Sequence, residues 1–178
     1  MKIMLDLETL STKSNAAIVA IGAVAFTEME VDVSSHFYRV ITPESCDLLG
    51  MHISGSTFSW WCQQSDAARA MFSDKSAGTI DMALKEFDSW CRATKVDEMW
   101  GNGADFDCVI LGSAYEAAHI GKPWSYSKNR CFRTLKSRIS PEEQNILWTK
   151  YATGTHHNAL DDAVRQAKIA VDIFGVGK

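Results

Sequence analysis

An uninterrupted apolar run, rich in isoleucine, valine and alanine, occupies Ala16–Phe26. A run of this length is typical of a β-strand buried on both faces, so the fold must provide layers that cover it. Side chains alternate in Lys2–Leu7, which indicates a strand before it, and the aromatic-rich His36–Ile41 indicates a third strand after a turn at Glu28–Asp32. The N-terminal part of the chain is therefore predicted to form an antiparallel meander.

After residue 50 the apolar positions recur at helical spacing. Helices are expected at Ser54–Gln64, Ile80–Arg92, Asp105–Ala118, Phe132–Arg138 and Asn158–Phe174, with short strands at Glu98–Gly101 and Trp124–Tyr126. This order favours an α/β fold: a mixed sheet of five to six strands, an antiparallel meander and then parallel strands, flanked by helices. The length of 178 residues fits a single domain over residues 1–178.

Composition places the chain among globular proteins and gives it a polarised charge. Hydrophobic residues make up 46% and the formal charge is −4, which excludes disordered and fibrous classes and a generic basic coat protein for nucleic acid. The acid-free segment Ala117–Pro141 nevertheless carries six basic residues, leaving twelve basic against 22 acidic residues elsewhere. No apolar run is long enough to span a membrane and no signal peptide opens the chain, so we expect a cytoplasmic protein. Five scattered cysteines predict buried, reduced thiols and no disulfide framework or zinc site.

Two carboxylates, Asp6 and Glu8, share one face of the first predicted strand. Because burying an uncompensated charge is very unfavourable, such carboxylates are exposed, paired or bound to a metal. The only base on that face is Lys2. Taken alone, the pair is better explained as the solvated end of a strand than as a site.

Two further polar groups lie at predicted helix starts. In Asn102-Gly103-Ala104-Asp105-Phe106-Asp107, Asp105 is interpreted as the helix N-cap, and Asp107 falls in the first turn, where a carboxylate favours the helix dipole. In His157-Asn158-Ala159-Leu160-Asp161-Asp162, an imidazole stands five residues before an acid. His156 and Asp161 share that spacing, which occurs readily by chance.

In their order and spacing, the three groups resemble the three motifs of the DEDDh (DnaQ-like) 3′–5′ exonucleases, and they extend over nearly the whole chain. The segment Ser56–Ser65, with its tryptophan pair, resembles one in phage DexA-type exodeoxyribonucleases and in a related bacterial exoribonuclease group. The family's third motif, His-x-Ala-Leu-x-Asp-Ala, matches His157 with Asp162 and fails for His156 with Asp161, so Asp161 is expected to face solvent. The resemblance implies an RNase H-like fold, in agreement with the mixed sheet.

The resemblance implies a nuclease that works with two divalent ions. Asp6, Glu8, Asp107 and Asp162 would bind Mg²⁺ or Mn²⁺, because hard oxygen donors suit these cations. His157 would be the general base that deprotonates the attacking water. The expected reaction is hydrolysis of phosphodiester bonds at the 3′ end of single-stranded DNA, with release of 5′-mononucleotides.

Substrate contacts are expected on both sides of these motifs. Phe106 and Trp61 offer aromatic faces for base stacking, with Trp60 expected to be the buried member of its pair. Arg133 and Lys136 lie three residues apart on the predicted basic helix, so both can contact the phosphates of one strand. The expected substrate-binding residues are Thr9, Leu10, Trp61, Asn102, Phe106, Arg133 and Lys136.

Two other functions stay open. The same scaffold suits a 3′–5′ exoribonuclease that trims RNA or short oligoribonucleotides, and a degenerate RNase H-like module would bind nucleic acid without cleaving it. Degenerate modules usually lose a carboxylate or the histidine, and all five positions are present here. The sequence leaves undecided the preference for DNA or RNA, the tolerance of duplexes, and the choice between a monomer and a homodimer.

Overall fold

A computed structural model of the chain describes residues 1–175, so the last three residues of the expected domain lie outside the described part. Its centre is a five-stranded sheet in the order β3-β2-β1-β4-β5. The strands are β1 (Lys2–Thr9), β2 (Ile18–Phe26), β3 (Val31–Val40), β4 (Glu98–Gly101) and β5 (Asn129–Cys131). β1, β2 and β3 pair antiparallel, whereas β4 runs parallel to β1 and β5 parallel to β4. The expected architecture, a meander followed by parallel strands, is confirmed.

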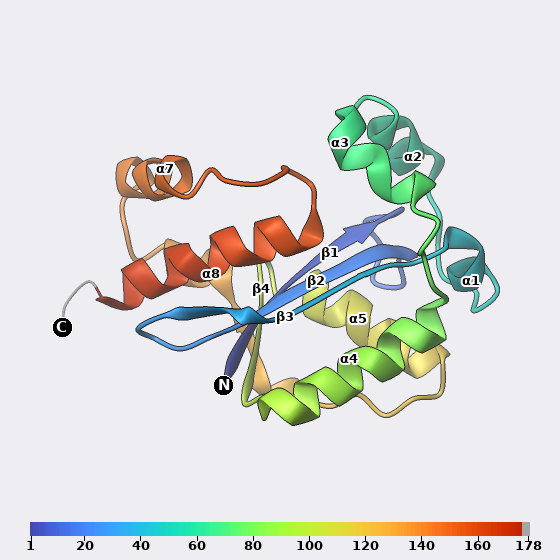
Figure 1. The fold of residues 1–178 in the computed structure, drawn as a ribbon, viewed down its shortest axis with the longest axis horizontal. Helices are drawn as coiled ribbons and strands as arrows, with labels where there is room; N and C mark the ends of the chain where they lie inside the picture. Colours follow the sequence, from blue (N-terminus) through green and yellow to red (C-terminus); the bar gives the residue numbers. More distant parts are fainter. Residues whose placement is uncertain (176–178) are drawn as a thin grey trace.

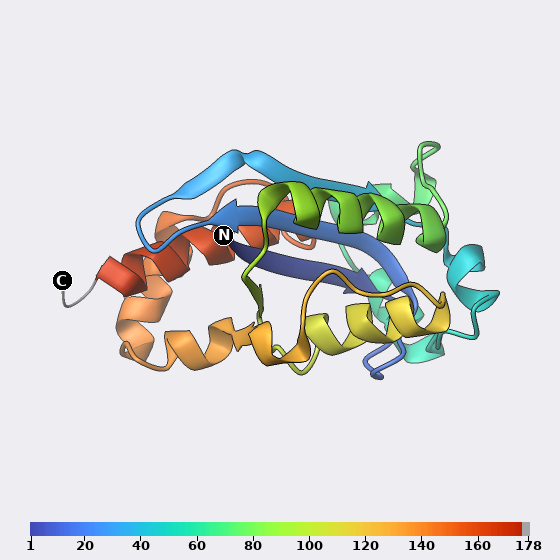
Figure 2. The ribbon, with the colours of Figure 1, turned by 90° about the horizontal axis from the view of Figure 1, so that it is seen from below.

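Helices cover both faces of the sheet, as Figures 1 and 2 show. α4 (Ile80–Thr94) and α5 (Asp107–Ala117) pack on one face, and α6 (Phe132–Lys136) and α8 (Ala159–Gly175) pack on the other. All of β2 is buried, as its apolar run predicts. The remaining helical segments are α1 (Pro43–Asp47), α2 (Gly55–Trp61), α3 (Asp66–Arg69), η1 (Ala70–Ser73), η2 (Tyr126–Lys128) and α7 (Pro141–Lys150). No helix within residues 1–175 is long and apolar enough to cross a membrane.

The alternation of β1 separates its apolar and acidic faces. Ile3, Leu5 and Leu7 join the core beneath α4 and α5, whereas Met4 joins the core beneath α8. Because side chains alternate, Asp6 and Glu8 point to the α8 face, as expected. α8 and α2 approach this end of β1 from opposite sides (Figure 1).

Gly22 lets α8 approach the sheet directly. It pairs with Asp6 across β1 and β2. A Cβ atom at Gly22 would lie 2.1 Å from the carbonyl carbon of Ala159, at the first residue of α8. An alanine stripe on this helix (Ala159, Ala163, Ala167, Ala170) is fully buried. Small residues on both elements therefore place the start of α8 against the middle of the sheet.

Two boundaries differ from the sequence predictions. Trp124–Tyr126 is not the last edge strand, which is β5; Trp124 is buried instead, its indole N–H donating to Asn129 Oδ1 at 2.8 Å. Asp105 is not a helix N-cap. It is exposed, and α5 begins two residues later because Gly103, with φ of 107°, turns its carbonyl toward the N–H groups of Phe106 and Asp107.

Other differences are smaller. β3 begins at Val31, inside the predicted turn, and its pairing with β2 shifts at Val24/Ala25. α7 follows a Ser140 capping box and was not predicted. All five cysteines are free, as expected, but Cys62 is exposed and Cys131 half-buried, so only the other three are buried thiols.

Candidate active site

Three carboxylates from the two ends of the chain meet at the carboxyl end of β1. Asp6 and Glu8 come from β1, and Asp162 comes from the first turn of α8. Each offers an oxygen that lies within 4.8 Å of the others. Glu8 is 6% exposed, and the other two are partly buried. The structure thus brings together three of the four predicted metal ligands.

The fourth predicted ligand, Asp107, approaches from α5. It is 3% exposed, and its Oδ1 accepts a hydrogen bond from the Leu7 N–H at 3.2 Å, between the two acidic residues of β1. Gly101 makes room for it, since a Cβ there would lie 2.9 Å from Asp107 Oδ2. Asp107 therefore borders the cluster on the side of β4.

Burial and mutual repulsion disfavour the ionised forms of these acids. Burial, then Asp162 and Asp107, raise the pKa of Glu8 to about 8. Burial raises the pKa of Asp107 to about 7, although the hydrogen bond from the Leu7 N–H lowers it. Burial, and after it the charges of Asp107 and Glu8, hold the pKa of Asp6 well above its ordinary value. These acids therefore hold their protons more tightly than carboxyl groups in water.

Within residues 1–175, no Lys or Arg forms an ion pair with Asp6, Glu8 or Asp107. Lys2, the base expected on this face, pairs with Glu98 at 2.7 Å instead. Glu8 Oε1 is buried without a hydrogen-bond partner. Buried charges in proteins are paired or coordinate metals, so this donor set fits a divalent cation.

The loop before α8 holds His157 in a left-handed backbone conformation, with φ of 63°. Such a conformation costs a non-glycine residue about 1–3 kcal/mol and persists only where the surroundings hold it. Here the His157 N–H donates to Asp162 Oδ2 at 3.0 Å. Asn158 Oδ1 accepts from the N–H groups of Leu160 and Asp161.

Asp161 does not simply face solvent as expected. It is half-buried, and its Oδ2 accepts a hydrogen bond from the Thr155 N–H at 2.7 Å. Asp161 therefore fastens the loop that carries the histidines, whereas Asp162 faces the carboxylates. This division supports the register in which His157 is paired with Asp162.

The His157 ring lies between the acids and aromatic side chains. Its centroid is 5.0 Å from Trp60, nearly perpendicular to it, and 3.9 Å from the His156 ring. Burial and His156 lower the pKa of His157, and Asp162 opposes them. The imidazole is therefore neutral near pH 7, the form that accepts a proton. Ligand atoms of His156, His157 and Asp162 also lie within 4.8 Å of one another.

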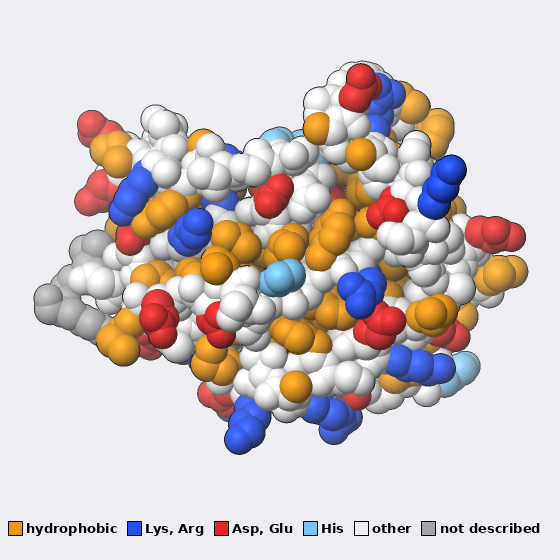
Figure 3. All heavy atoms as spheres, viewed as in Figure 1, with side chains coloured by type: hydrophobic (Ala, Val, Ile, Leu, Met, Phe, Trp, Pro, Cys, Tyr) orange, Lys and Arg blue, Asp and Glu red, His pale blue; other side chains and the backbone are white. Residues whose placement is uncertain are grey.

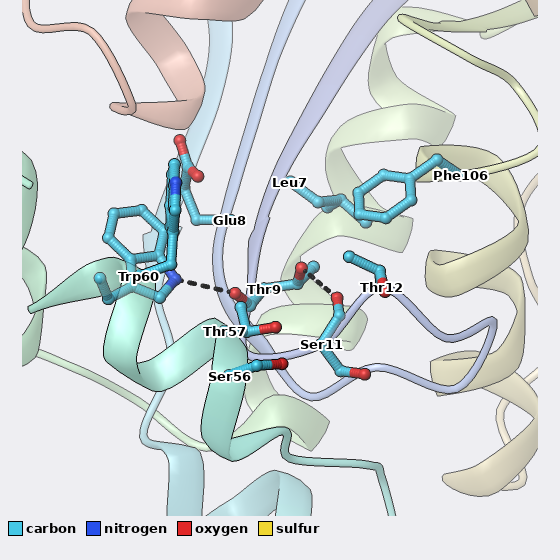
Figure 4. Close-up of a pocket in the computed structure, with 10 residues that line it drawn as sticks. Leu7, Glu8, Thr9, Ser11, Thr12, Ser56, Thr57, Trp60 and Phe106 are labelled. Carbon is cyan, nitrogen blue, oxygen red and sulfur yellow. Dashed lines mark hydrogen bonds between the residues drawn. The ribbon is translucent and has the colours of Figure 1, made fainter. Parts of the chain in front are cut away.

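A pocket of about 380 Å³ opens beside Glu8. Trp60 and Phe106 stand on opposite sides of it, with Glu8 and Thr9 between them (Figure 4). The tryptophan pair is the reverse of the expectation. Trp60 is 42% exposed, whereas Trp61 is 2% exposed and donates its indole N–H to the Thr9 carbonyl at 2.9 Å, which turns Trp60 outward. Both rings line the pocket, Trp60 as its exposed wall.

The other expected substrate-binding residues differ in how exposed they are and in what they contact. Leu10 is 3% exposed in the core and does not line the pocket, and both of its backbone polar groups are hydrogen-bonded to other backbone groups. Asn102 accepts at its carbonyl from Arg133 Nη2 at 2.9 Å, and its side-chain oxygen is buried without a partner. Lys136 is half-buried, with its ammonium over the rings of Phe132 and Trp148.

The basic stretch divides between the two ends of the sheet. Lys128 and Arg130 pair with Asp97 and Glu98 at the beginning of β4, far along the strand from the carboxylates. Arg133 follows β5 at the opposite end and lowers the pKa of Asp107 slightly through its charge. Only the second part of the stretch therefore adjoins the candidate site. On the face in Figure 3, positive and negative side chains are interspersed.

Residues 1–174 match the family model of the 3′–5′ exoribonuclease Rv2179c-like domain. The chain belongs to the Rv2179c-like family. No curated protein matches the chain. Among solved structures, cell-death related nuclease 4 (CRN-4) matches with a TM-score of 0.70 and 14% sequence identity, which shows a shared fold. That match covers 99% of this chain and 64% of the CRN-4 chain, so this chain spans less than two thirds of that protein.

Membership in the Rv2179c-like family supports a DnaQ-like 3′–5′ exonuclease, as the three motifs predict. The closer likeness to DexA-type enzymes stays a prediction. Within this family member, sequence reasoning missed Gln166, which is buried on α8 and donates to Asp6 at 2.8 Å. A signal was present, because Gln166 follows Asp162 by four residues and so shares its helix face.

Sequence reasoning also missed the polar rim and a neighbouring notch. Hydroxyl side chains border the pocket beside Glu8 at Ser11, Thr12, Ser56 and Thr57. A second cavity of about 260 Å³ lies between His157 and the α3–η1 segment, where Tyr38 and Asp74 line it. Figure 3 shows a notch between this segment and the loop before α8. The histidine loop is thus open to solvent on one side and packed on the other.

Proposed function

We propose that this chain is a metal-dependent 3′–5′ exoribonuclease that removes nucleotides one at a time from single-stranded RNA ends. The observation that carries the proposal is the group of four carboxylates beside a pocket with aromatic walls. Among residues 1–175, Asp6, Glu8 and Asp107 form no ion pair with a Lys or Arg. Of the four, Asp162 alone has a basic partner in this range, Arg165 Nη1 at 4.0 Å. From the sequence alone, single-stranded DNA was the expected substrate. The family description names an exoribonuclease, so RNA is the better supported substrate.

Four side chains would hold the metal. Asp6, Glu8 and Asp162 offer oxygens close enough to share one ion, and Asp107 borders them from α5. When bound, divalent ions stabilise the charge that develops on the phosphate and on the leaving oxygen during in-line displacement. The unpartnered Glu8 Oε1 supports this assignment, because it leaves a buried acceptor free for a cation.

The remaining chemistry belongs to the chain. Neutral His157 accepts a proton from the attacking water, which forms the new P–O bond while the bond to the 3′ oxygen of the penultimate nucleotide breaks. Trp60 and Phe106 hold the terminal base between them, and stacking of this kind is worth about 1–3 kcal/mol per base. Arg133 keeps free N–H donors for a phosphate, because its contact with Asn102 uses one of them.

A direct assay tests the proposal. RNA and DNA strands of the same sequence, each labelled at the 5′ end, are incubated with the protein in Mg²⁺, in Mn²⁺ and in EDTA. We expect the labelled RNA to shorten progressively from its 3′ end and release 5′-mononucleotides, with faster decay of RNA than of DNA. EDTA should stop the reaction in both.

Matched controls separate the parts of this proposal. Asp162→Asn should remove turnover while the circular dichroism spectrum stays unchanged, and circular strands should resist. Faster decay of DNA would reverse the substrate assignment alone. Cleavage of circles, or full activity in EDTA, would exclude a metal-dependent exonuclease.

A further inference from the structure

Gln166 is fixed beside the first carboxylate of the cluster. It lies one turn after Asp162 on α8, and both side chains face β1. Gln166 is 2% exposed, and its Nε2 donates a hydrogen bond to Asp6 Oδ1 at 2.8 Å. We infer that Gln166 is a positioning residue that orients the Asp6 carboxylate for divalent-metal binding, an inference that rests on the proposed function.

The hydrogen bond from Gln166 reaches only one of the two Asp6 carboxylate oxygens, Oδ1. An amide NH₂ group can only donate, and an ionised carboxylate offers about four acceptor sites on its two oxygens. Gln166 occupies one site on Oδ1, and the other acceptor sites of the carboxylate stay available to the space shared with Glu8 and Asp162. Within residues 1–175, no other side chain donates a hydrogen bond to Asp6, and no base pairs with it.

The orientation of the Asp6 carboxylate toward the cluster needs support, because the neighbouring acidic groups repel it. Asp107, Glu8 and Asp162 all act on Asp6 with the same sign. Without a fixed donor, repulsion would turn the Asp6 carboxylate away from these neighbours in the metal-free protein. The hydrogen bond from Gln166 keeps it facing them, so that a cation meets ligands that are already arranged.

Packing alone does not account for a glutamine at this position. Its Oε1 is buried without a hydrogen-bond partner, which is unfavourable. The surrounding residues of α8, among them Ala163, Ala167 and Ala170, are apolar and fully buried. A methionine of similar length would fill the same space without an unsatisfied oxygen. The fold therefore retains the unsatisfied Gln166 Oε1, although it is destabilising, in a side chain whose NH₂ group donates to Asp6.

Metal affinity measured on the full chain tests this inference. Mn²⁺ is titrated by calorimetry into the unmodified protein and into Gln166→Met. We expect the Kd for Mn²⁺ to rise about 10- to 100-fold, as for other partners of metal ligands, with Tm in EDTA unchanged or higher. Turnover should recover at saturating Mn²⁺, so that the change appears in the metal concentration for half-maximal rate and little in kcat.

Two further variants distinguish orientation from packing. Gln144→Met removes donors to the carbonyls of Lys136 and Ile139, so it should lower Tm and leave Mn²⁺ affinity unchanged. Gln166→Asn keeps the amide but is one methylene too short to reach Asp6, and it should weaken Mn²⁺ binding as Gln166→Met does.

Each outcome bears on a different claim. If the unmodified chain binds no Mn²⁺, the proposed function fails. If it binds Mn²⁺ and both Gln166 variants bind equally well, only the role of Gln166 fails. Failure of both variants to fold would show that the core requires this glutamine and would overturn the inference as well.

Discussion

Single carboxyl groups in this protein hold protons that they would lose in water. Burial, then Asp162 and Asp107, raise the pKa of Glu8 to about 8, and burial raises that of Asp107 to about 7. These carboxyl groups lie where we propose that four side chains bind a divalent metal ion. Such groups are frequent where proteins bind metals or catalyse reactions.

Stability without metal should therefore fall as the pH rises. The folded chain keeps protons on Glu8 and Asp107 that the unfolded chain has already released, so folding is favoured at low pH and this contribution is lost as pH passes about 8. The pKa of His157 is lowered, so this group makes the stability rise with pH, but only at pH values below its ordinary pKa of 6.5. Thermal unfolding in EDTA at about pH 6.5 and 8.5 should show a lower Tm at the higher pH.

Glu8→Gln is the control for this pH dependence, because it stays neutral throughout and should make the Tm less dependent on pH. Mg²⁺ should have a similar effect on the unmodified chain. A Tm in EDTA that rises between these two pH values would contradict the electrostatic account of the cluster.

The two adjacent histidines should behave differently. His157→Ala removes the proposed proton acceptor and should lower kcat by about 10²- to 10⁴-fold, the usual span for general acid–base catalysis. His156→Ala should change kcat little, since His156 is exposed and does not match the histidine of the family's third motif. Single-turnover rates at saturating metal measure both. The reverse ranking would mean that the loop register is wrong.

At the scale of elements, a helix or strand could be predicted from the sequence where one local pattern of apolar residues decides its structure. β1, β2 and β4 follow from alternation or from continuous burial. Trp124–Tyr126 was misassigned because aromatic residues suit a strand, whereas this tryptophan is buried by contacts with distant elements. α7 was missed although Ser140-Pro141-Glu142-Glu143 carries a capping box, because its weakly amphipathic sequence gives no clear helical face.

The contact of β2 with α8 gives a prediction of its own. Gly22→Ala places a methyl group against the backbone of Ala159, so α8 must move away from the sheet. We expect a loss of at least about 1–3 kcal/mol in the free energy of unfolding and weaker Mn²⁺ binding, because Asp162 moves with the helix. Gly78→Ala, where nothing lies within 4 Å of the added Cβ, should change neither quantity. Equal denaturation midpoints for the two variants would exclude this close contact.

The basic helix α6 should contribute to phosphate binding. Arg133→Gln with Lys136→Gln should raise KM, leave kcat at saturating substrate unchanged and flatten the dependence of log affinity on log salt by about one unit. Lys128→Gln with Arg130→Gln is the matched control, because these side chains already pair with Asp97 and Glu98. Filter binding of single-stranded RNA to Asp162→Asn backgrounds measures the slopes. Equal slopes in both double variants would assign all four charges to the solvated surface.

For the whole molecule, the motifs predicted which side chains come together better than they predicted their surroundings. Asp6, Glu8, Asp107, Asp162 and His157 could be named because they match the order and spacing of the family's motifs, whereas each group taken alone had a simpler structural explanation. Gln166 and the outward turn of Trp60 could not, since both depend on how a helix is rotated against the sheet. That rotation is set by distant contacts, such as the Trp61 N–H to Thr9 bond and the Gly22 approach.

The docking of α8 on Gly22 also makes the candidate site depend on long-range folding. Asp6 and Glu8 are more than 150 residues away in the sequence from Asp162. A partly folded chain in which α8 has not yet docked therefore holds only two of the three clustered carboxylates in place. The proposed metal affinity and the proposed proton acceptor would thus arise in one folding step, when α8 closes over the sheet.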